Sequence, residues 1–300
     1  MDNKLSVLTP VYNGASMIER CYWALLNQTW NNWEWIVVDD GSTDQTLAIL
    51  QRLAASDARI QIIPTMPNRG RGYARTVALN AMSCDWGVLW DADDLYMPNR
   101  LERIALARSQ GYEYYTSPVV VMDQEYNVIG LRERGFALKP YMQPIITHAA
   151  TAARSDVMRE IGYNPNLKTV GQIGEDAAMV FRLSVCHRGF YDSLPTMINQ
   201  VGYEVFLRKS VHSNEIQLRV IQEMWHAGQL PINKTMYREL LRRRKLRLMM
   251  LRSLGVLPPI YPAIMRRRRK GTTVQGVQLD PAAQLFVDEV RRLYMSNSNQ

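Results

Sequence analysis

The sequence is poor in cysteine and has no long apolar run. Its three cysteines, Cys21, Cys84 and Cys186, are far apart, and none belongs to a CxxC or Cys/His pattern. We therefore expect neither a disulfide framework nor a zinc site, and a reducing compartment fits best. No run approaches the roughly 18 apolar residues of a membrane-spanning helix. Because the chain also opens without a basic and apolar leader, we expect a cytoplasmic protein.

Acidic residues are scarce in the strongly basic segment 231–270. Residues 231–270 hold 13 Lys and Arg against the single acid Glu239, whereas the rest of the chain has 23 basic and 27 acidic side chains. The net charge of +8 therefore comes from the C-terminal part. Because the remainder is net acidic and the basic segment has no interleaved aromatic platform, we do not expect nucleic acid as a partner.

Apolar runs alternate with helix-like segments over the first hundred residues. The apolar runs lie at 5–9, 35–38, 60–63 and 87–90. Helical patterns follow the first three, at 15–28, 44–55 and 73–82. This order predicts an α/β fold with a mostly parallel sheet flanked by helices. Ligands of such sheets bind beyond the carboxyl ends of the strands, so the loops that follow the runs should share one functional edge.

Three carboxylates follow the fourth apolar run, in the pentapeptide WDADD at 90–94. Acids this close raise the cost of ionising one another. A polar turn is one interpretation, since Asp is a good turn and N-cap residue. The other is a cation site, because hard divalent cations prefer carboxylate oxygens.

Five blocks in order resemble the family 2 glycosyltransferases, which have the GT-A fold. They are TPVYNG at 9–14, IVVDDGSTDQT at 36–46, NRGRGYAR at 68–75, WDADD at 90–94 and GED at 174–176. The resemblance implies transfer of a sugar from a nucleotide diphosphate sugar to an acceptor hydroxyl, with inversion and a bound Mn²⁺ or Mg²⁺. Cell-surface polysaccharide or glycolipid synthesis is the expected setting. The QxxRW pattern of processive synthases is absent, which favours addition of one sugar per binding event.

The resemblance also assigns metal ligands. Asp91-Ala-Asp93 looks like the DxD motif of the family, in which Asp93 would bind the metal and Asp91 would reach the ribose, or the metal through water. His212 is the one histidine that the resemblance offers as a further ligand. The other three are expected to be surface or core residues, namely His148, His187 and His226.

The first three blocks carry the expected nucleotide contacts. Thr9, Pro10 and Tyr12 match the first nucleotide loop, and a core position is the alternative interpretation of Tyr12. Asp39 matches a carboxylate that accepts a hydrogen bond from the base, which favours a UDP-sugar. Arg75 would contact the base or a phosphate.

Two acids, Glu175 and Asp176, precede an apolar helical pattern. Acids at a helix N-terminus are common because they interact favourably with the helix dipole. In the family, the second acid of this pair is the general base. Asp176 would therefore take the proton of the acceptor hydroxyl as it attacks, with Glu175 supporting it or contacting the acceptor.

We divide the chain at residue 230 into a GT-A domain, 1–230, and a basic helical extension, 231–300. The nucleotide half of the domain is about 1–100 and the acceptor half about 101–230. Within the extension, one predicted helical face carries Tyr237, Leu240, Leu241, Leu248 and Leu251. This face either packs on the domain or, with the basic residues of 237–270, lies on an anionic membrane. A membrane location suits a glycan or lipid-linked acceptor.

Two other classes remain as alternatives. A nucleotidyltransferase also combines an α/β sheet with metal and carboxylates, but it needs a Gly-rich phosphate loop after the first strand, and residues 9–14 lack one. A non-catalytic nucleotide- or RNA-binding protein would rely on the basic segment. Binding of UDP-sugars or of RNA at physiological salt separates these possibilities.

Overall fold

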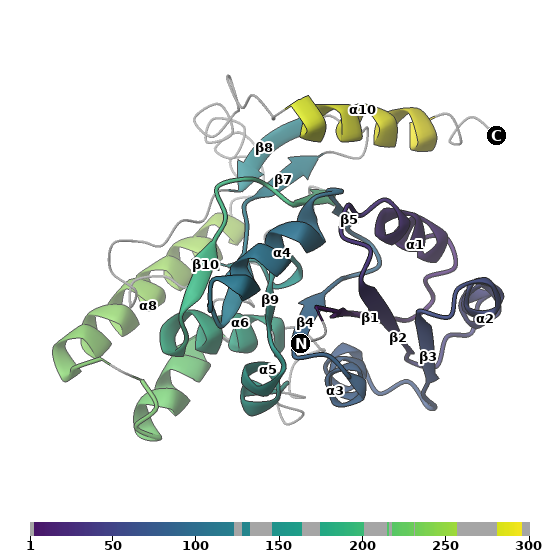
Figure 1. Cartoon of the computed structure of the whole chain (residues 1–300). Helices are drawn as coiled ribbons and strands as arrows, with labels where there is room; N and C mark the ends of the chain where they lie inside the picture. The colour runs from purple at the N-terminus through teal and green to yellow at the C-terminus, as the bar shows by residue number, and fades with distance from the viewer. Residues whose placement is uncertain are drawn as a thin grey trace.

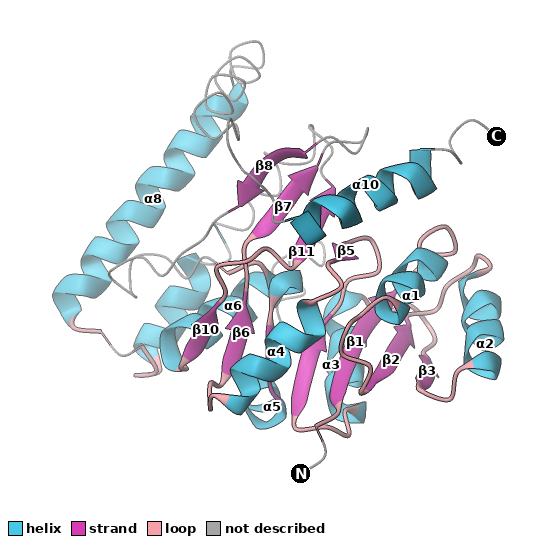
Figure 2. Ribbon diagram, turned by 45° about the horizontal axis from the view of Figure 1, so that its top comes forward, coloured by secondary structure: helices cyan, strands magenta, loops and turns pink. Residues whose placement is uncertain are grey.

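The computed structural model describes residues 3–122, 128–132, 146–163, 175–200, 215, 218–230, 232–256 and 281–295. A seven-stranded sheet, in the order β10-β6-β9-β4-β1-β2-β3, forms the centre of these residues (Figures 1 and 2). Its strands are β1 (Leu5–Val11), β2 (Trp33–Asp39), β3 (Ile60–Pro64), β4 (Trp86–Leu89), β6 (Tyr114–Thr116), β9 (Ala152–Arg154) and β10 (Gly189–Tyr191). Strand β9 runs antiparallel to β4 and β6, while the other neighbours are parallel. The predicted α/β fold with a mostly parallel sheet is confirmed.

Helices cover both faces of this sheet. They are α1 (Ile18–Leu26), α2 (Thr46–Ser56), α3 (Arg71–Ala81), α4 (Arg100–Ser109), α5 (Ser155–Ile161) and α6 (Glu175–Cys186). Successive strand residues point to opposite faces, so Val7 and Trp35 pack with α1, α2 and α4, whereas Leu8 and Ile36 pack with α3, α5 and α6. Burial on both faces explains why these strands read as continuous apolar runs.

A second sheet lies beside the first and has the order β5-β11-β7-β8. Its strands are β5 (Leu95–Tyr96), β7 (Val119–Met122), β8 (Val128–Arg132) and β11 (Met197–Gln200). Helix α10 (Pro281–Met295) covers this sheet (Figure 1), with Phe286 and Val287 packed against Leu95 and Val120. The Phe286 ring also stacks on Trp23 of α1, with centroids 5.8 Å apart. The end of the described chain is therefore part of the body.

Helix α8 (Lys234–Val256) is the basic helix that the sequence predicts. Tyr237 and Leu240 are buried with Phe181 of α6 and with Val220 of the helical residues 218–226. The predicted apolar face thus packs on the body at its N-terminal half, and the domain boundary at residue 230 stays a prediction. Within the described ranges, no helix combines the length and apolar character that crossing a bilayer requires.

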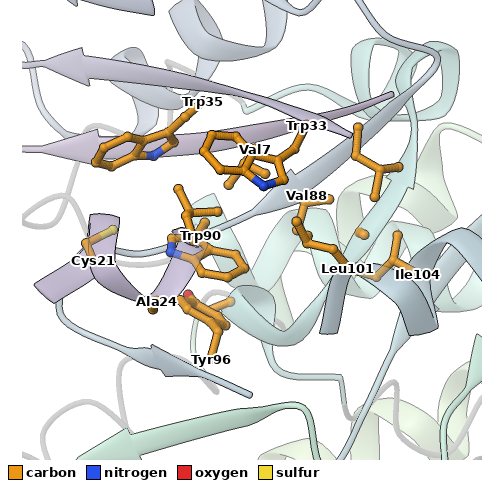
Figure 3. Close-up of a cluster of buried hydrophobic side chains, with 14 of the residues drawn as sticks. Val7, Cys21, Ala24, Trp33, Trp35, Val88, Trp90, Tyr96, Leu101 and Ile104 are labelled. Atoms are coloured by element: carbon orange, nitrogen blue, oxygen red, sulfur yellow. The ribbon is translucent and has the colours of Figure 1, made fainter. Parts of the chain in front are cut away.

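Buried aromatic rings support the acidic loop that follows β4. Trp90 stacks on Tyr96 with ring centroids 3.8 Å apart, and both belong to the same buried cluster as Val7 of β1 (Figure 3). The backbone N–H of Asp91 donates to the Tyr96 hydroxyl at 2.7 Å. The acidic loop therefore starts directly after a residue that is fixed in the buried core.

Candidate active site

The loops after β1 and β2 are tied together at the carboxyl edge of the sheet. Thr43 N–H donates to Asn13 Oδ1 at 2.8 Å, and Asn13 N–H donates to Ser42 Oγ at 2.9 Å. The hydroxyl of Thr46 accepts from Gly14 N–H at 2.8 Å. The polar residues of these loops thus fix each other's backbone.

Asp40 connects the loop after β2 to the loop that leads into α3. Its carboxylate accepts from the backbone N–H groups of Arg69 and Gly70, at 3.1 and 2.6 Å, and from the Thr65 hydroxyl at 3.1 Å. Gly41 makes this approach feasible, because it has a φ of +75° and a Cβ there would lie 3.0 Å from Asn68 N. Three predicted loops therefore meet at one edge.

The acids of the WDADD segment form a compact cluster. One carboxylate oxygen from each of Asp91, Asp93 and Asp94 lies within 4.8 Å of the others. Asp94 is buried and accepts from Asn199 Nδ2 at 2.7 Å, whereas Asp93 is exposed. Oxygen ligands at this spacing fit a hard divalent cation such as Mg²⁺ or Mn²⁺. The donor set is therefore suited to the predicted metal.

Arg75 of α3 contacts the cluster directly. Its Nη2 donates to both carboxylate oxygens of Asp91, at 2.9 and 3.1 Å. Burial alone would raise the pKa of Asp91, but the charge and hydrogen bonds of Arg75 lower it to about 2. The structure therefore shows Arg75 holding an ionised Asp91.

A cavity of about 620 Å³ opens beside the cluster. Of the predicted site residues, it brings together Pro10, Tyr12, Asp91, Asp93 and Asp176. Tyr12 is 49% exposed, so it is not a core aromatic. Asp176 reaches the cavity as the second residue of α6, directly after Glu175.

Other predicted residues lie outside this lining. The Thr9 hydroxyl accepts from Trp35 Nε1 at 2.8 Å in the core, and Asp39 Oδ1 accepts from Ser42 N–H at 3.1 Å. The neighbour of Asp39, Asp40, lines the cavity instead. His212 lies outside the described residues.

The polar lining residues that were not predicted as site residues include Arg71, His148 and Asn199. Asn199 comes from β11 of the second sheet, and His148 begins the short 3₁₀ helix His148–Ala150. Burial lowers the pKa of His148 far below its usual value, and Arg75 acts in the same direction, so the imidazole is neutral. No local sequence pattern marks either residue, because each is brought to the cavity by long-range packing.

A larger cavity, of about 1000 Å³, lies at the opposite edge of the sheet. Its arginines are paired with acids: Arg103 with Asp192, Arg108 with Asp85 and Arg154 with Asp156. The acidic cluster and Asp176 belong to the smaller cavity, which is therefore the candidate active site.

Comparison with solved structures identifies the fold. The chain resembles Staphylococcus aureus TarS 1-349 in complex with UDP, with a TM-score of 0.57 and 19% identity over 79% of this chain and 69% of that one. It also resembles the mannosyltransferase PcManGT from Pyrobaculum calidifontis in complex with GDP-Man and Mn²⁺, with a TM-score of 0.60 and 17% identity over 97% and 87% of the two chains. The fold is therefore the GT-A fold.

Residues 6–161 match the sequence model described as Glycosyl transferase family 2, so the chain belongs to glycosyltransferase family 2. The putative teichuronic acid biosynthesis glycosyltransferase TuaG of Bacillus subtilis is 37% identical over 99 residues, which are 33% of this chain and 39% of TuaG. The Escherichia coli protein WfgD, named as a UDP-Glc:alpha-D-GlcNAc-diphosphoundecaprenol beta-1,3-glucosyltransferase, is 35% identical over 34% of this chain and 39% of its own length. The chain thus spans about two fifths of these relatives.

Proposed function

We propose that this protein is an inverting, metal-dependent glycosyltransferase that moves one sugar from a UDP-sugar to an acceptor hydroxyl. Cell-surface polysaccharide or glycolipid synthesis is the proposed setting. The observation that carries the proposal is that Asp176 and the acidic cluster line the same cavity. A single in-line displacement requires a base on the side of attack and charge stabilisation on the side of departure.

The residues divide these tasks. Asp176 takes the proton of the acceptor hydroxyl, and Glu175 supports it or contacts the acceptor. Asp93 is the proposed direct metal ligand, flanked by Asp91 and Asp94. When bound, the divalent cation offsets the charge that develops on the departing diphosphate.

The donor nucleotide is proposed to be UDP. TarS was solved with UDP and with UDP-GlcNAc, and the name of WfgD specifies UDP-Glc. The exposed Tyr12 is placed to stack on the base. We propose Asp40, rather than Asp39, as the acceptor for the uracil N–H, because Asp40 lines the cavity. Among the described residues its Oδ2 accepts one hydrogen bond, from Gly70 N–H, and a carboxylate oxygen has room for a second.

Calorimetry with nucleotides tests this proposal. We expect UDP to bind in the presence of Mn²⁺ at least roughly tenfold more tightly than GDP, because the uracil contact is specific, and EDTA to weaken binding. A panel of UDP-sugars should then identify one whose slow hydrolysis releases UDP. Release of pyrophosphate from UTP and a sugar phosphate would instead establish nucleotidyltransfer, and RNA binding at physiological salt without UDP binding would establish the non-catalytic alternative.

The acceptor is proposed to be a lipid-linked or envelope glycan at an anionic membrane. The packed face of α8 is not available for this contact, because Tyr237 and Leu240 are buried on the body. The opposite face exposes three apolar side chains beside basic ones. The apolar residues are Leu246, Met249 and Met250, at 47%, 58% and 53% exposure, and the exposed basic residues are Arg242, Arg243 and Lys245.

This exposed face has the composition of a membrane-surface helix, with apolar groups to insert and cations for anionic headgroups. Each Lys or Arg near such a surface contributes about 1 kcal/mol. The basic run at 266–270 lies outside the described residues. We therefore propose reversible, peripheral attachment at the cytoplasmic face through α8.

Sedimentation with lipid vesicles tests the attachment. The combined substitutions Leu246→Gln, Met249→Gln and Met250→Gln should reduce pelleting with phosphatidylglycerol vesicles several-fold, because they remove the inserting groups and leave the packed face intact. High salt should release the unmodified protein, since the electrostatic part is screened. Leu285→Gln on α10, where the side chain is 70% exposed, is the control and should pellet normally. Equal pelleting of the triple variant, or equal binding to neutral vesicles, would contradict the proposal.

A further inference from the structure

His148 lines the candidate active site, and only one of its two ring nitrogens has a hydrogen-bond partner among the described residues. Its Nε2 is 2.7 Å from the Tyr163 hydroxyl. Its Nδ1 is buried and makes no hydrogen bond to any of the described residues. A buried polar atom left unsatisfied is costly, so it usually has a partner that the protein alone does not supply. Since His148 lines the cavity, a bound ligand is the partner that fits.

The backbone around His148 is held firmly. The His148 carbonyl accepts from Thr151 N–H at 2.9 Å, and the Thr151 hydroxyl donates to the Thr147 carbonyl at 2.9 Å. The buried Arg100 donates to the Ala149 carbonyl at 2.9 Å. The imidazole is therefore oriented before any ligand arrives, which is what a recognition contact requires.

The position of His148 indicates which part of the substrate it meets. Both Asp91 of the acidic cluster and Asp176 act electrostatically on the imidazole. In the proposed reaction, the diphosphate departs on the side of the cluster and the acceptor attacks on the side of Asp176. The transferred sugar must lie between these two sides, and its exposed polar groups are hydroxyls.

On the basis of the proposed function, we propose that His148 Nδ1 hydrogen-bonds a hydroxyl of the transferred sugar and so helps to determine which sugar is accepted. A neutral imidazole suits this task, because one nitrogen donates and the other accepts. The Tyr163 hydroxyl can donate to Nε2 or accept from it, so Nδ1 can take either role toward a sugar hydroxyl. A sugar that lacks the hydroxyl, or holds it in the other configuration, leaves Nδ1 unsatisfied and is rejected.

Paired substitutions separate the two nitrogens. His148→Asn places an amide near the Nδ1 position and loses the Tyr163 contact, whereas His148→Gln places an amide near Nε2 and loses the inward contact. His148→Leu removes both. We measure UDP binding by calorimetry, and kcat and KM with UDP-glucose, UDP-galactose and UDP-GlcNAc, using Tyr163→Phe as a further control.

We expect His148→Leu to keep UDP affinity within about twofold and to lower kcat/KM for the preferred UDP-sugar by roughly 10- to 100-fold, with narrowed discrimination among the three sugars. His148→Asn should restore much of this loss and His148→Gln should not. Rescue by Gln alone, or an equal loss of UDP binding, would assign His148 to packing or to the nucleotide and overturn the inference. If the unmodified protein transfers sugar and His148→Leu discriminates among the three UDP-sugars as well as it does, this inference fails and the proposed function stands. An unmodified protein that uses no UDP-sugar would overturn the proposed function itself.

Discussion

Asp93→Asn should lower kcat/KM for sugar transfer by at least about 100-fold, equivalent to about 3 kcal/mol of barrier. Asp93 is the exposed acid of the cluster, whereas Asp94 is buried and Asp91 is half-buried. Removing the Asp93 charge therefore removes the group that we assign as direct ligand, and with it the charge stabilisation of the leaving diphosphate. The measurement is the rate of transfer as a function of Mn²⁺ or Mg²⁺ concentration.

The control for this substitution is Asp288→Asn. Asp288 is exposed on α10, away from the cavity, and its Oδ1 accepts from Gln284 Nε2 at 3.0 Å. It should leave transfer and its metal dependence unchanged. Because the Asp93 side chain is exposed, Asp93→Asn should keep the thermal midpoint of the native protein. Near-normal transfer by Asp93→Asn with an unaltered metal dependence would show that another residue is the ligand.

The nucleotide half of the fold could be predicted because short stretches of sequence identify its strands and loops. The strands β1 to β4 are apolar on both faces, and each of the loops after them contains a polar or glycine block. The antiparallel strand β9, which lies between β4 and β6, was not predicted. Its three residues, 152–154, are placed by contacts with strands far away in the sequence, which no local pattern records.

Within the site, the sequence does not decide which of two adjacent acids, Asp39 or Asp40, lines the cavity. Both acids end the same apolar run, so their spacing cannot tell which one faces the ligand. The left-handed conformation of Gly41 turns the chain there, and Asp40 then binds the loop before α3 and lines the cavity. Asn199 and His148 were missed for a related reason, since each approaches from a segment about 50 residues or more beyond the WDADD loop.

The basic helix α8 also shows what a sequence pattern cannot determine. The N-terminal part of its predicted apolar face, Tyr237 and Leu240, is buried, but periodicity alone does not identify the partner of that face. Tyr237 and Leu240 pack on Phe181, and Arg244, four residues after Leu240, is only 6% exposed. The surface proposed for the membrane is consequently the less regular, opposite face, which the sequence pattern did not single out.

Asp176→Asn is the substitution that separates catalysis from helix capping. Asparagine keeps the shape of the side chain and its ability to accept hydrogen bonds at the start of α6, but it does not accept a proton from an attacking hydroxyl. We expect transfer to fall by roughly 10²- to 10⁴-fold, while UDP and the metal bind as before. The measurements are single-turnover transfer from the UDP-sugar and calorimetry with UDP.

Asp156→Asn is the matched control. Asp156 is the second residue of α5, as Asp176 is of α6, but it lines the larger cavity at the opposite edge and is paired with Arg154. Both substitutions remove a carboxylate from the first turn of a helix, where the dipole contributes about 0.3–1 kcal/mol. If Asp176 is only a cap, the two variants should lose similar stability and both should transfer sugar normally. A large loss of transfer in Asp176→Asn alone, with an unchanged thermal midpoint and normal UDP binding, is the result that a general base requires.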